Sequence, residues 1–162
     1  MKIEVDTSNY IQPEPCVIVS CRDKKGKDNA LPIGFAANVS FEPRIIMIAI
    51  IDIRYSHSII TESGEFVVNI AREDYRDTMN YFGGTSGRDI DKLENIPTVD
   101  GDVVDAPLLV DCPVNFECTV IESVTPGTHT VFFGRVDKVH CDEEYVDEDG
   151  LIMWDKIDVL QN

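Results

Sequence analysis

An arginine and two serines lie close together, directly before a segment that could form a short helix. Arg54 follows a run of apolar residues, and Ser56 and Ser58 come two and four positions later. The first turn of a helix has unpaired N–H groups and a partial positive charge, so donors at this point could hold a phosphate group. The same residues also fit an ordinary serine-capped helix with a surface arginine. The residues alone leave both interpretations open.

The segment 32–40 is a second candidate, because its small residues would let a flat ligand approach the backbone. Asn38 and Ser40 could add side-chain hydrogen bonds, although a plain strand and loop packed on the core fits equally well. His129 follows a Pro-Gly turn and could reach such a pocket or lie at a partly exposed strand position. The glycine-rich segment 83–88 lacks the lysine and spacing of a P-loop, which favours a flexible loop over an anion site.

No catalytic side chain is predicted. No serine, histidine and acid form a recognisable triad, and the chain has too many carboxylates for any pair to stand out. The five cysteines are an odd number without CxxC spacing, which favours reduced thiols over disulfides and predicts no metal site. They are Cys16, Cys21, Cys112, Cys118 and Cys141.

The composition limits the class of protein. The chain has 162 residues, and we predict a single domain over residues 1–162. Its formal net charge of −16 argues against nucleic acid and against an anionic membrane surface as partners. The longest apolar run, residues 45–51, is too short for a membrane span, and the first residues are acidic where a secretory signal needs an apolar core. We therefore expect a cytoplasmic protein.

Short runs of β-branched residues dominate the pattern and indicate strands. The expected strands cover residues 16–21, 29–40 (opening into a loop), 45–51 (buried on both faces), 65–70, and a hairpin of 115–124 and 128–139 around the turn 125–127. The expected helices cover 55–63, capped by Ser56 or Ser58 and stopped by Gly64, then 73–82 and 88–94.

The remaining segments have weaker patterns. Residues 95–109 are expected to be irregular, and the tail 151–160 could hold one last strand. Phe132, Phe133 and Trp154 are expected in the core or a subunit interface, and His140 on the surface. The whole pattern predicts an α+β, mainly-β domain, most simply a small barrel with short helices at its ends.

The order of these motifs resembles the flavin reductase-like family, whose fold is the FMN-binding split β-barrel of flavoredoxins and small NAD(P)H:flavin oxidoreductases. The matching pieces are PEPCVIVSC, KGKDNALPIGFAANVSFEP, IIMIAII, RYSHSIITESGEFVVNI, SGRDIDKLE, APLLVDCPVNFECTVIE and GTHTVFFGRVDKV, in that order. Arg44 departs from the family pattern, because many relatives have a second proline there, and residues 142–162 match poorly.

The resemblance implies a split barrel with short peripheral helices and a homodimer that binds FMN near the subunit interface. It implies that the loop between the second and third strands lines the isoalloxazine ring, that the segment before the short helix holds the phosphate, and that a histidine lies near the flavin. The corresponding residues are Pro32, Ile33, Gly34, Phe35 and Asn38 for the ring, Arg54, Ser56 and Ser58 for the phosphate, and His129.

The resemblance also implies an activity. It points to an FMN-dependent oxidoreductase, either a flavin reductase or an electron-transfer protein of the flavoredoxin type. The flavin would supply the redox chemistry, and NADH, NADPH or a redox protein would supply the electrons. A non-enzymatic FMN carrier and a ligand-free β-barrel interaction module remain as alternatives. No motif distinguishes NADH from NADPH.

Overall fold

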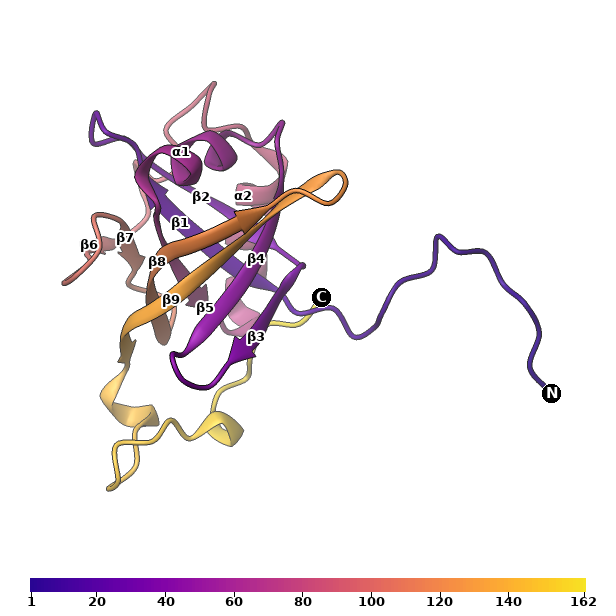
Figure 1. The fold of residues 1–162 in the computed structure, drawn as a ribbon. Helices are drawn as coiled ribbons and strands as arrows, with labels where there is room; N and C mark the ends of the chain where they lie inside the picture. The colour runs from indigo at the N-terminus through magenta and orange to yellow at the C-terminus, as the bar shows by residue number, and fades with distance from the viewer.

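The computed structural model describes residues 1–162 and contains one antiparallel sheet of seven strands in the order β2-β1-β5-β8-β9-β4-β3 (Figure 1). Its strands are β1 (Val17–Arg22), β2 (Asp28–Ile33), β3 (Ala36–Ser40), β4 (Ile45–Ile51), β5 (Glu65–Ile70), β8 (Val114–Val124) and β9 (His129–Cys141). A two-stranded sheet pairs β6 (Thr98–Asp100) with β7 (Pro107–Leu109). The helices are α1 (Tyr55–Ser63) and α2 (Arg76–Gly84), with single 3-10 turns at Glu73–Tyr75, Glu143–Tyr145 and Trp154–Lys156.

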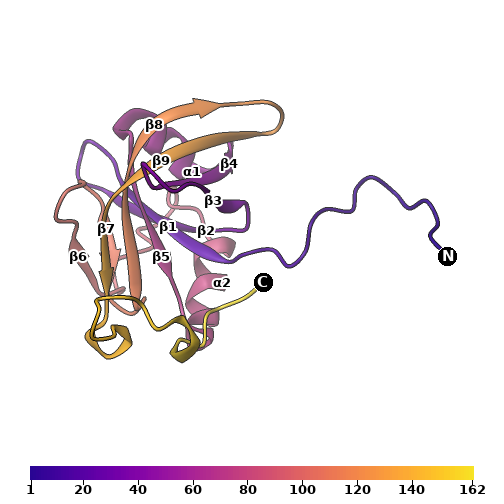
Figure 2. The same cartoon turned by 60° about the horizontal axis from the view of Figure 1, so that its bottom comes forward.

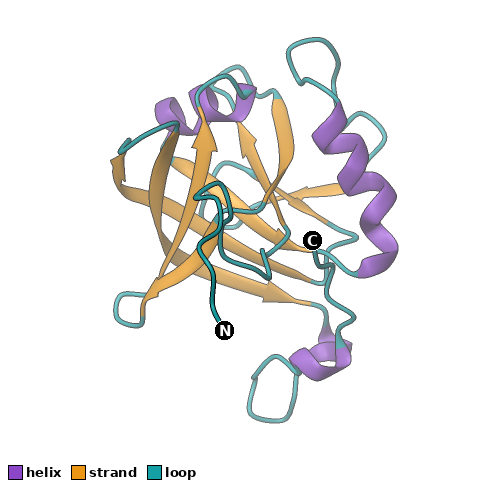
Figure 3. Ribbon diagram, turned by 90° about the vertical axis from the view of Figure 1, so that its right-hand side faces the viewer, coloured by secondary structure: helices purple, strands orange, loops and turns teal.

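The large sheet is strongly curled. β2 and β3 form its two edges, yet only Gly34 and Phe35 separate them in the chain. Seven strands laid flat would hold these edges about 30 Å apart, which two residues cannot span. The sheet therefore bends until its edges approach each other, with α1 across one end and α2 along the side (Figure 3). This confirms the predicted α+β, mainly-β fold of the split-barrel type with short peripheral helices.

Alternate residues of the strands fill the interior of the barrel, because side chains along a strand point to opposite faces. Ile48, Phe66, Cys118 and Phe132 belong to this inner core and are at most 2% exposed. Phe132 thus lies in the core, as expected. Trp154 lies outside it and is 45% exposed, so its place in the core is not confirmed.

A second core lies on the outer face of the sheet at β1, where α2 packs. Met79 and Phe82 of α2 belong to this buried cluster together with Ile18 of β1 and Ala30 of β2, so β1 is buried on both faces. β4 was expected to be buried in the same way, but its outer face carries the partly exposed Ile45 and Met47. The prediction is only half right, because α2 covers the outer face at β1 and not at β4.

Helix α1 is confirmed at both ends. Gly64 ends it in the left-handed conformation (φ +69°), and its N–H donates to Ile60 O at 2.8 Å. The prediction that Ser56 or Ser58 caps its N-terminus is wrong. Arg54 occupies the cap position with an extended backbone and makes no side-chain capping bond, and both serines lie inside the helix.

The strands at β1, β4, β5 and the β8–β9 hairpin are confirmed to within about two residues, as is the helix predicted at 73–82. Residues 88–94 were expected to be helical but form successive turns. In these turns Asp91 Oδ1 accepts the N–H of Leu93 at 3.0 Å, which competes with helical bonding.

Three other segments differ from expectation. Residues 29–40 form two strands, β2 and β3, because the chain crosses here from one edge of the sheet to the other. Residues 95–109 were expected to be irregular but contain β6 and β7. The tail 151–160 forms isolated bridges, such as Arg72 with Val159, and no strand. No helix in the structure is long and apolar enough to cross a membrane.

Candidate functional site

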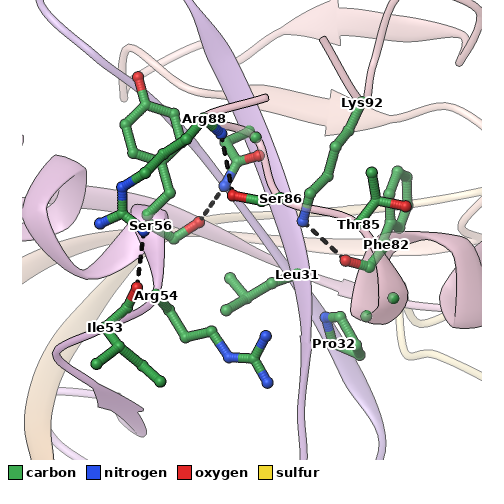
Figure 4. A pocket seen from close by; sticks show the side chains of 15 residues that line it. Leu31, Pro32, Ile53, Arg54, Ser56, Phe82, Thr85, Ser86, Arg88 and Lys92 are labelled. Carbon is green, nitrogen blue, oxygen red and sulfur yellow. Dashed lines mark hydrogen bonds between the residues drawn. The ribbon is translucent and has the colours of Figure 1, made fainter. Parts of the chain in front are cut away.

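A cavity of about 330 Å³ lies where the start of α1 faces the end of α2 and the loop that follows it (Figure 4). Arg54 comes from the start of α1, and Arg88 and Lys92 come from the loop after α2. None of the fifteen lining residues is Asp or Glu, although the chain contains 30 of these acids. The cavity is therefore a local region of positive potential on a strongly acidic protein.

The three cations of the cavity have no carboxylate partners. Six other cations do form ion pairs with carboxylates, namely Arg22, Lys24, Arg72, Arg76, Arg135 and Lys138. Arg54, Arg88 and Lys92 appear in none of the ion pairs of the structure. Their charges are therefore available to an anionic ligand.

Lys92 is buried, being 5% exposed, and its ammonium group is only partly satisfied. Nζ donates to Ala30 O at 3.0 Å and to Phe82 O at 2.7 Å. An ammonium group has three N–H donors, so one remains for a ligand. Burial, together with the nearby charge of Arg54, lowers the pKa of Lys92 to about 8. The group is thus mainly protonated at neutral pH.

Arg88 fastens the loop after α2 to the start of α1. Its Nη1 donates to Ile53 O at 2.8 Å, and its guanidinium carbon lies 5.4 Å from the centre of the Tyr55 ring. Lys27 Nζ lies 5.1 Å from the same ring and donates to Gly87 O. Both cations contact the Tyr55 ring of α1 and donate to backbone carbonyls, so they hold the loop against the start of α1 and fix the wall of the cavity.

One buried polar atom of the cavity has no partner. Asn29 Nδ2 donates to the buried Ser56 Oγ at 2.8 Å, and this bond sets the orientation of the Asn29 amide. Its Oδ1 is buried and accepts no hydrogen bond. Buried acceptors are rarely left unpaired, so a hydroxyl or N–H group of a ligand would stabilise this site.

A second hollow of about 180 Å³ adjoins the cavity and shares Leu31, Pro32 and Arg54 with it. Its walls are mainly apolar and include Ile33, Gly34, Phe35, Ala49, Ile50 and Ile51. His129 also lines it, with its ring centre 5.1 Å from that of Phe35. The two hollows give the site a cationic end and a mainly apolar end, which Glu14 also lines.

The structure brings together most of the residues that the sequence singled out. Pro32, Ile33, Gly34, Phe35, Arg54 and His129 line the apolar hollow, and Ser56 lines the cationic cavity. Ser58 is exposed and donates to Tyr55 O at 3.0 Å, and Asn38 is exposed on the edge strand β3. These two residues line neither hollow, and their role in binding stays a prediction.

Sequence reasoning missed the other half of the cationic cavity. Ser86 and Arg88 belong to the glycine-rich segment whose use as an anion loop was the less favoured interpretation, and its first two glycines in fact end α2. No local sequence pattern marked Asn29 or Lys92 as residues of the site. They reach the cavity only through the folding of β2 and of the turns at 88–94.

His140 was expected on the surface, but it lies partly buried beside the fully buried Glu117. The His140 Nε2 to Glu117 Oε2 distance is 2.5 Å, and Glu117 Oε1 accepts the N–H groups of Val103 at 2.9 Å and Val104 at 3.1 Å. Burial acts to raise the pKa of Glu117, but the hydrogen bonds from His140 and the backbone hold it below its ordinary value. This carboxylate is satisfied by the protein and holds the loop before β7 in place.

The fold and the site together define a curled β-sheet protein that presents a cationic cavity beside a mainly apolar hollow. Residues 10–157 match the flavin reductase like domain, and the chain belongs to that family.

Solved structures agree with this assignment. The flavoredoxin of Methanosarcina acetivorans is 27% identical and superimposes with a TM-score of 0.93 over 99% of this chain and 86% of that one. The flavoredoxin of Desulfovibrio vulgaris (Miyazaki F) is 28% identical, with a TM-score of 0.91 over 99% and 87% of the two chains.

A sequence relative has a named role. The reductase subunit HsaB of a flavin-dependent monooxygenase from Rhodococcus jostii is 30% identical over 116 residues, which are 69% of this chain and 57% of that subunit. Across six curated relatives, the aligned part makes up between 37% and 73% of their length. The family and its named members support a flavin-related oxidoreductase role with a flavin as cofactor.

Proposed function

We propose that this protein is an FMN-dependent oxidoreductase in which bound FMN carries electrons from NADH, NADPH or a redox protein to an acceptor. The observation that carries the proposal is the charge pattern of the site, where three cations and no acid line a cavity of a −16 chain. Such a cavity stabilises a phosphate group. The adjoining apolar hollow suits the flat ring system of a flavin.

Two polar atoms of the cavity fit the non-aromatic part of FMN. The spare N–H of Lys92 can donate to a phosphate oxygen, beside the guanidinium of Arg54. The unpaired Oδ1 of Asn29 can accept a hydrogen bond from a ribityl hydroxyl. FMN would thus provide partners for groups that the protein itself leaves without them.

FMN supplies the two-electron redox chemistry when it is bound, and the protein supplies binding and orientation. Pro32 and Phe35 would contact the ring, and His129 would close the hollow beside Phe35. Gly34 allows close packing at this point, since a Cβ there would lie 1.7 Å from Glu14 Oε1. The proposed chemistry requires no side chain of the hollow as an acid or base.

A homodimer with the flavin near the subunit interface is part of this proposal. Phe35 lies at the rim of the apolar hollow and is 42% exposed in the single chain. A large aromatic residue at the open side of a ring-binding hollow suits contact with a second subunit.

The phosphate assignment is tested by comparing FMN with riboflavin, which lacks the phosphate. We expect Arg54→Ala to weaken FMN binding about 10- to 100-fold, as a lost charge-assisted hydrogen bond costs about 1.5–3 kcal/mol. Riboflavin binding should change less than about threefold, because only the phosphate contact is removed. Fluorescence titration measures both affinities. Arg135→Ala is the matched control, since Arg135 lies on β9 and lines neither hollow.

Equal losses for the two ligands, or no loss for FMN, would contradict the assignment. Wild-type protein that takes up neither ligand would favour the ligand-free interaction module. Protein that binds FMN but is reduced by neither NADH nor NADPH would favour a carrier or a partner of another redox protein.

A further inference from the structure

Residues 1–12 form an extended arm that leads away from the barrel (Figures 1 and 2). The hydrogen bonds of this arm are all local, such as Ser8 N to Asp6 Oδ1 at 2.7 Å. Its apolar side chains are nevertheless large and exposed, with Ile3 at 79%, Val5 at 65% and Ile11 at 89%. A row of exposed apolar residues on a segment without tertiary hydrogen bonds indicates a surface that another molecule covers.

The arm has the pattern of a strand. Ile3 and Val5 alternate with Lys2, Glu4 and Asp6, so that one face of an extended chain would be apolar and the other charged, with two acids and one lysine. The chain turns at Thr7 and Ser8, and the six residues before this turn would span about 20 Å when extended, which is enough to lie along one strand of a neighbouring barrel. The arm can therefore add to a sheet edge outside its own subunit.

The arm leaves the barrel at the rim of the apolar hollow. Tyr10 contacts Phe35 edge to face, with ring centres 6.1 Å apart, and Glu14 lines the hollow itself. Phe35 directly precedes the edge strand β3. A second copy placed over this rim would bring each arm close to the β3 edge of the other copy.

The β3–β4 hairpin offers a matching surface. β3 pairs only with β4, so its other edge has free backbone groups. Phe41, in the turn between the two strands, is 86% exposed, and the Arg44 guanidinium carbon lies 5.5 Å from its ring centre. Arg44 has no carboxylate partner in the structure. The hairpin thus combines an apolar side chain with an unpaired cation.

We propose that the arm of one copy lies along β3 and the β3–β4 turn of a second copy, and that the two copies exchange arms. Ile3 and Val5 would cover Phe41, and Arg44, which lies against the Phe41 ring, would reach past the edge of the arm to the carboxylates of Glu4 and Asp6 on its other face. Most of this acidic protein would repel Glu4 and Asp6, which makes the surface at Arg44 the complementary one. The proposal rests on the homodimer of the proposed function and adds the segment and the surface that form it.

Sedimentation velocity of the full chain tests whether the arm holds the dimer. We expect a dimer for the wild type and at least tenfold weaker dimerisation for the double variant Ile3→Asp/Val5→Asp. Leu151→Asp is the control and should remain dimeric, because Leu151 is exposed at 64% in the C-terminal tail. A monomeric wild type, or an arm variant that dimerises as well as the wild type, would overturn the proposal.

Cross-linking between mixed copies tests where the arm lies. A tagged Ile3→Cys chain is mixed with an untagged Phe41→Cys chain, both carrying Cys141→Ser to remove the one cysteine that is not buried. A short bis-maleimide should join a tagged to an untagged chain. The absence of this product, or an efficient link within one doubly substituted chain at high dilution, would overturn the exchange.

The flavin content of every sample is recorded separately, so the two proposals can fail independently. A colourless protein that still shows arm-dependent dimerisation supports the exchange and contradicts FMN binding. A yellow protein that is monomeric supports FMN binding and contradicts the exchange of arms.

Discussion

Two buried charged residues, Lys92 and Glu117, differ in how far the protein satisfies their hydrogen-bonding groups. Glu117 receives hydrogen bonds from His140 and from the backbone of the loop before β7, so that it is satisfied without a ligand. Lys92 receives two carbonyl contacts and keeps one donor free at a cavity that contains no acid. We infer that Glu117 stabilises the fold and that Lys92 serves binding.

FMN affinity should depend on the protonation of Lys92. Its pKa is lowered to about 8, so the group loses its charge as the pH rises through that value. The charged form is the one that attracts a phosphate. We expect FMN affinity to fall by up to about thirtyfold between pH 7 and pH 9.5, because the charged fraction of a group with a pKa of about 8 falls from about 0.9 to about 0.03 over this range.

Titrations with riboflavin provide the control, because a ligand without phosphate should show little change over this range. Lys92→Met should bind FMN weakly at pH 7 and lose the pH dependence. A wild-type affinity for FMN that is constant from pH 7 to pH 9.5 would contradict the role of Lys92.

Glu117→Gln should destabilise the fold without removing the flavin site. Removing one partner of a buried charged network costs about 3 kcal/mol, and we expect a loss of this size in the free energy of unfolding at pH 7. The pKa of Glu117 is lowered in the folded state. The ionised carboxylate therefore stabilises the fold fully above about pH 4.5, and this stabilisation is lost as the pH falls below that value. The difference between variant and wild type should therefore shrink at low pH.

Urea unfolding at pH 7 and pH 4 measures this difference. Asp102→Asn is the matched control, because Asp102 is exposed and contacts the same group of residues. If Glu117→Gln unfolds like the control at pH 7, the carboxylate does not hold the loop.

A residue's place in the site could be predicted where its neighbours in the sequence define the local structure around it. Arg54 precedes a helix, and Pro32 to Phe35 cover the end of β2 and the short link to β3, so both segments stood out. Asn29 and Lys92 are an ordinary strand residue and an ordinary lysine in the sequence. Their position at the cavity depends on contacts with α1 and α2 that no local pattern encodes.

At the scale of elements, the predictable ones are those that local periodicity and stop signals define. α1 ends at Gly64 as predicted, and the β8–β9 hairpin forms around its Pro-Gly turn. The failures lie at residues 29–40, 88–94 and 95–109. There the backbone is set by the crossing between sheet edges, by the cavity wall and by the second sheet, all of which are tertiary contacts.

The loop after α2 packs directly on β2, and this contact can be tested through its glycines. A Cβ on Gly87 would lie 2.2 Å from Asn29 Oδ1 and 2.9 Å from Tyr55 Cδ1. Asn29 is buried and cannot move freely. We expect Gly87→Ala to displace the Asn29 amide and to weaken FMN binding about tenfold, which corresponds to about 1.4 kcal/mol.

Gly84→Ala is the control for this substitution. A Cβ on Gly84 would meet nothing within 4 Å, although Gly84 lies on the same cavity wall. Calorimetric titration with FMN compares the two variants. If they bind FMN equally well, the close packing of the loop on Asn29 does not contribute to the site.

At the scale of the whole molecule, the curl of the sheet is what creates the site. β2 and β4 are separated in the sheet order by four strands, yet residues of both line the apolar hollow. The cationic cavity lies next to this hollow on a protein of net charge −16. The overall charge alone predicts that anions are repelled, and only the fold shows that three unpaired cations gather at one place.

The absorption spectrum of the purified protein, taken after addition of FMN and removal of free flavin, tests the central claim most directly. We predict one tightly bound FMN per chain, with the bands of oxidised flavin, and anaerobic bleaching of these bands by NADH, NADPH or a reduced redox protein. A protein that keeps no FMN after this treatment would contradict the account. A protein that keeps FMN but is bleached by none of these reductants would contradict the oxidoreductase role.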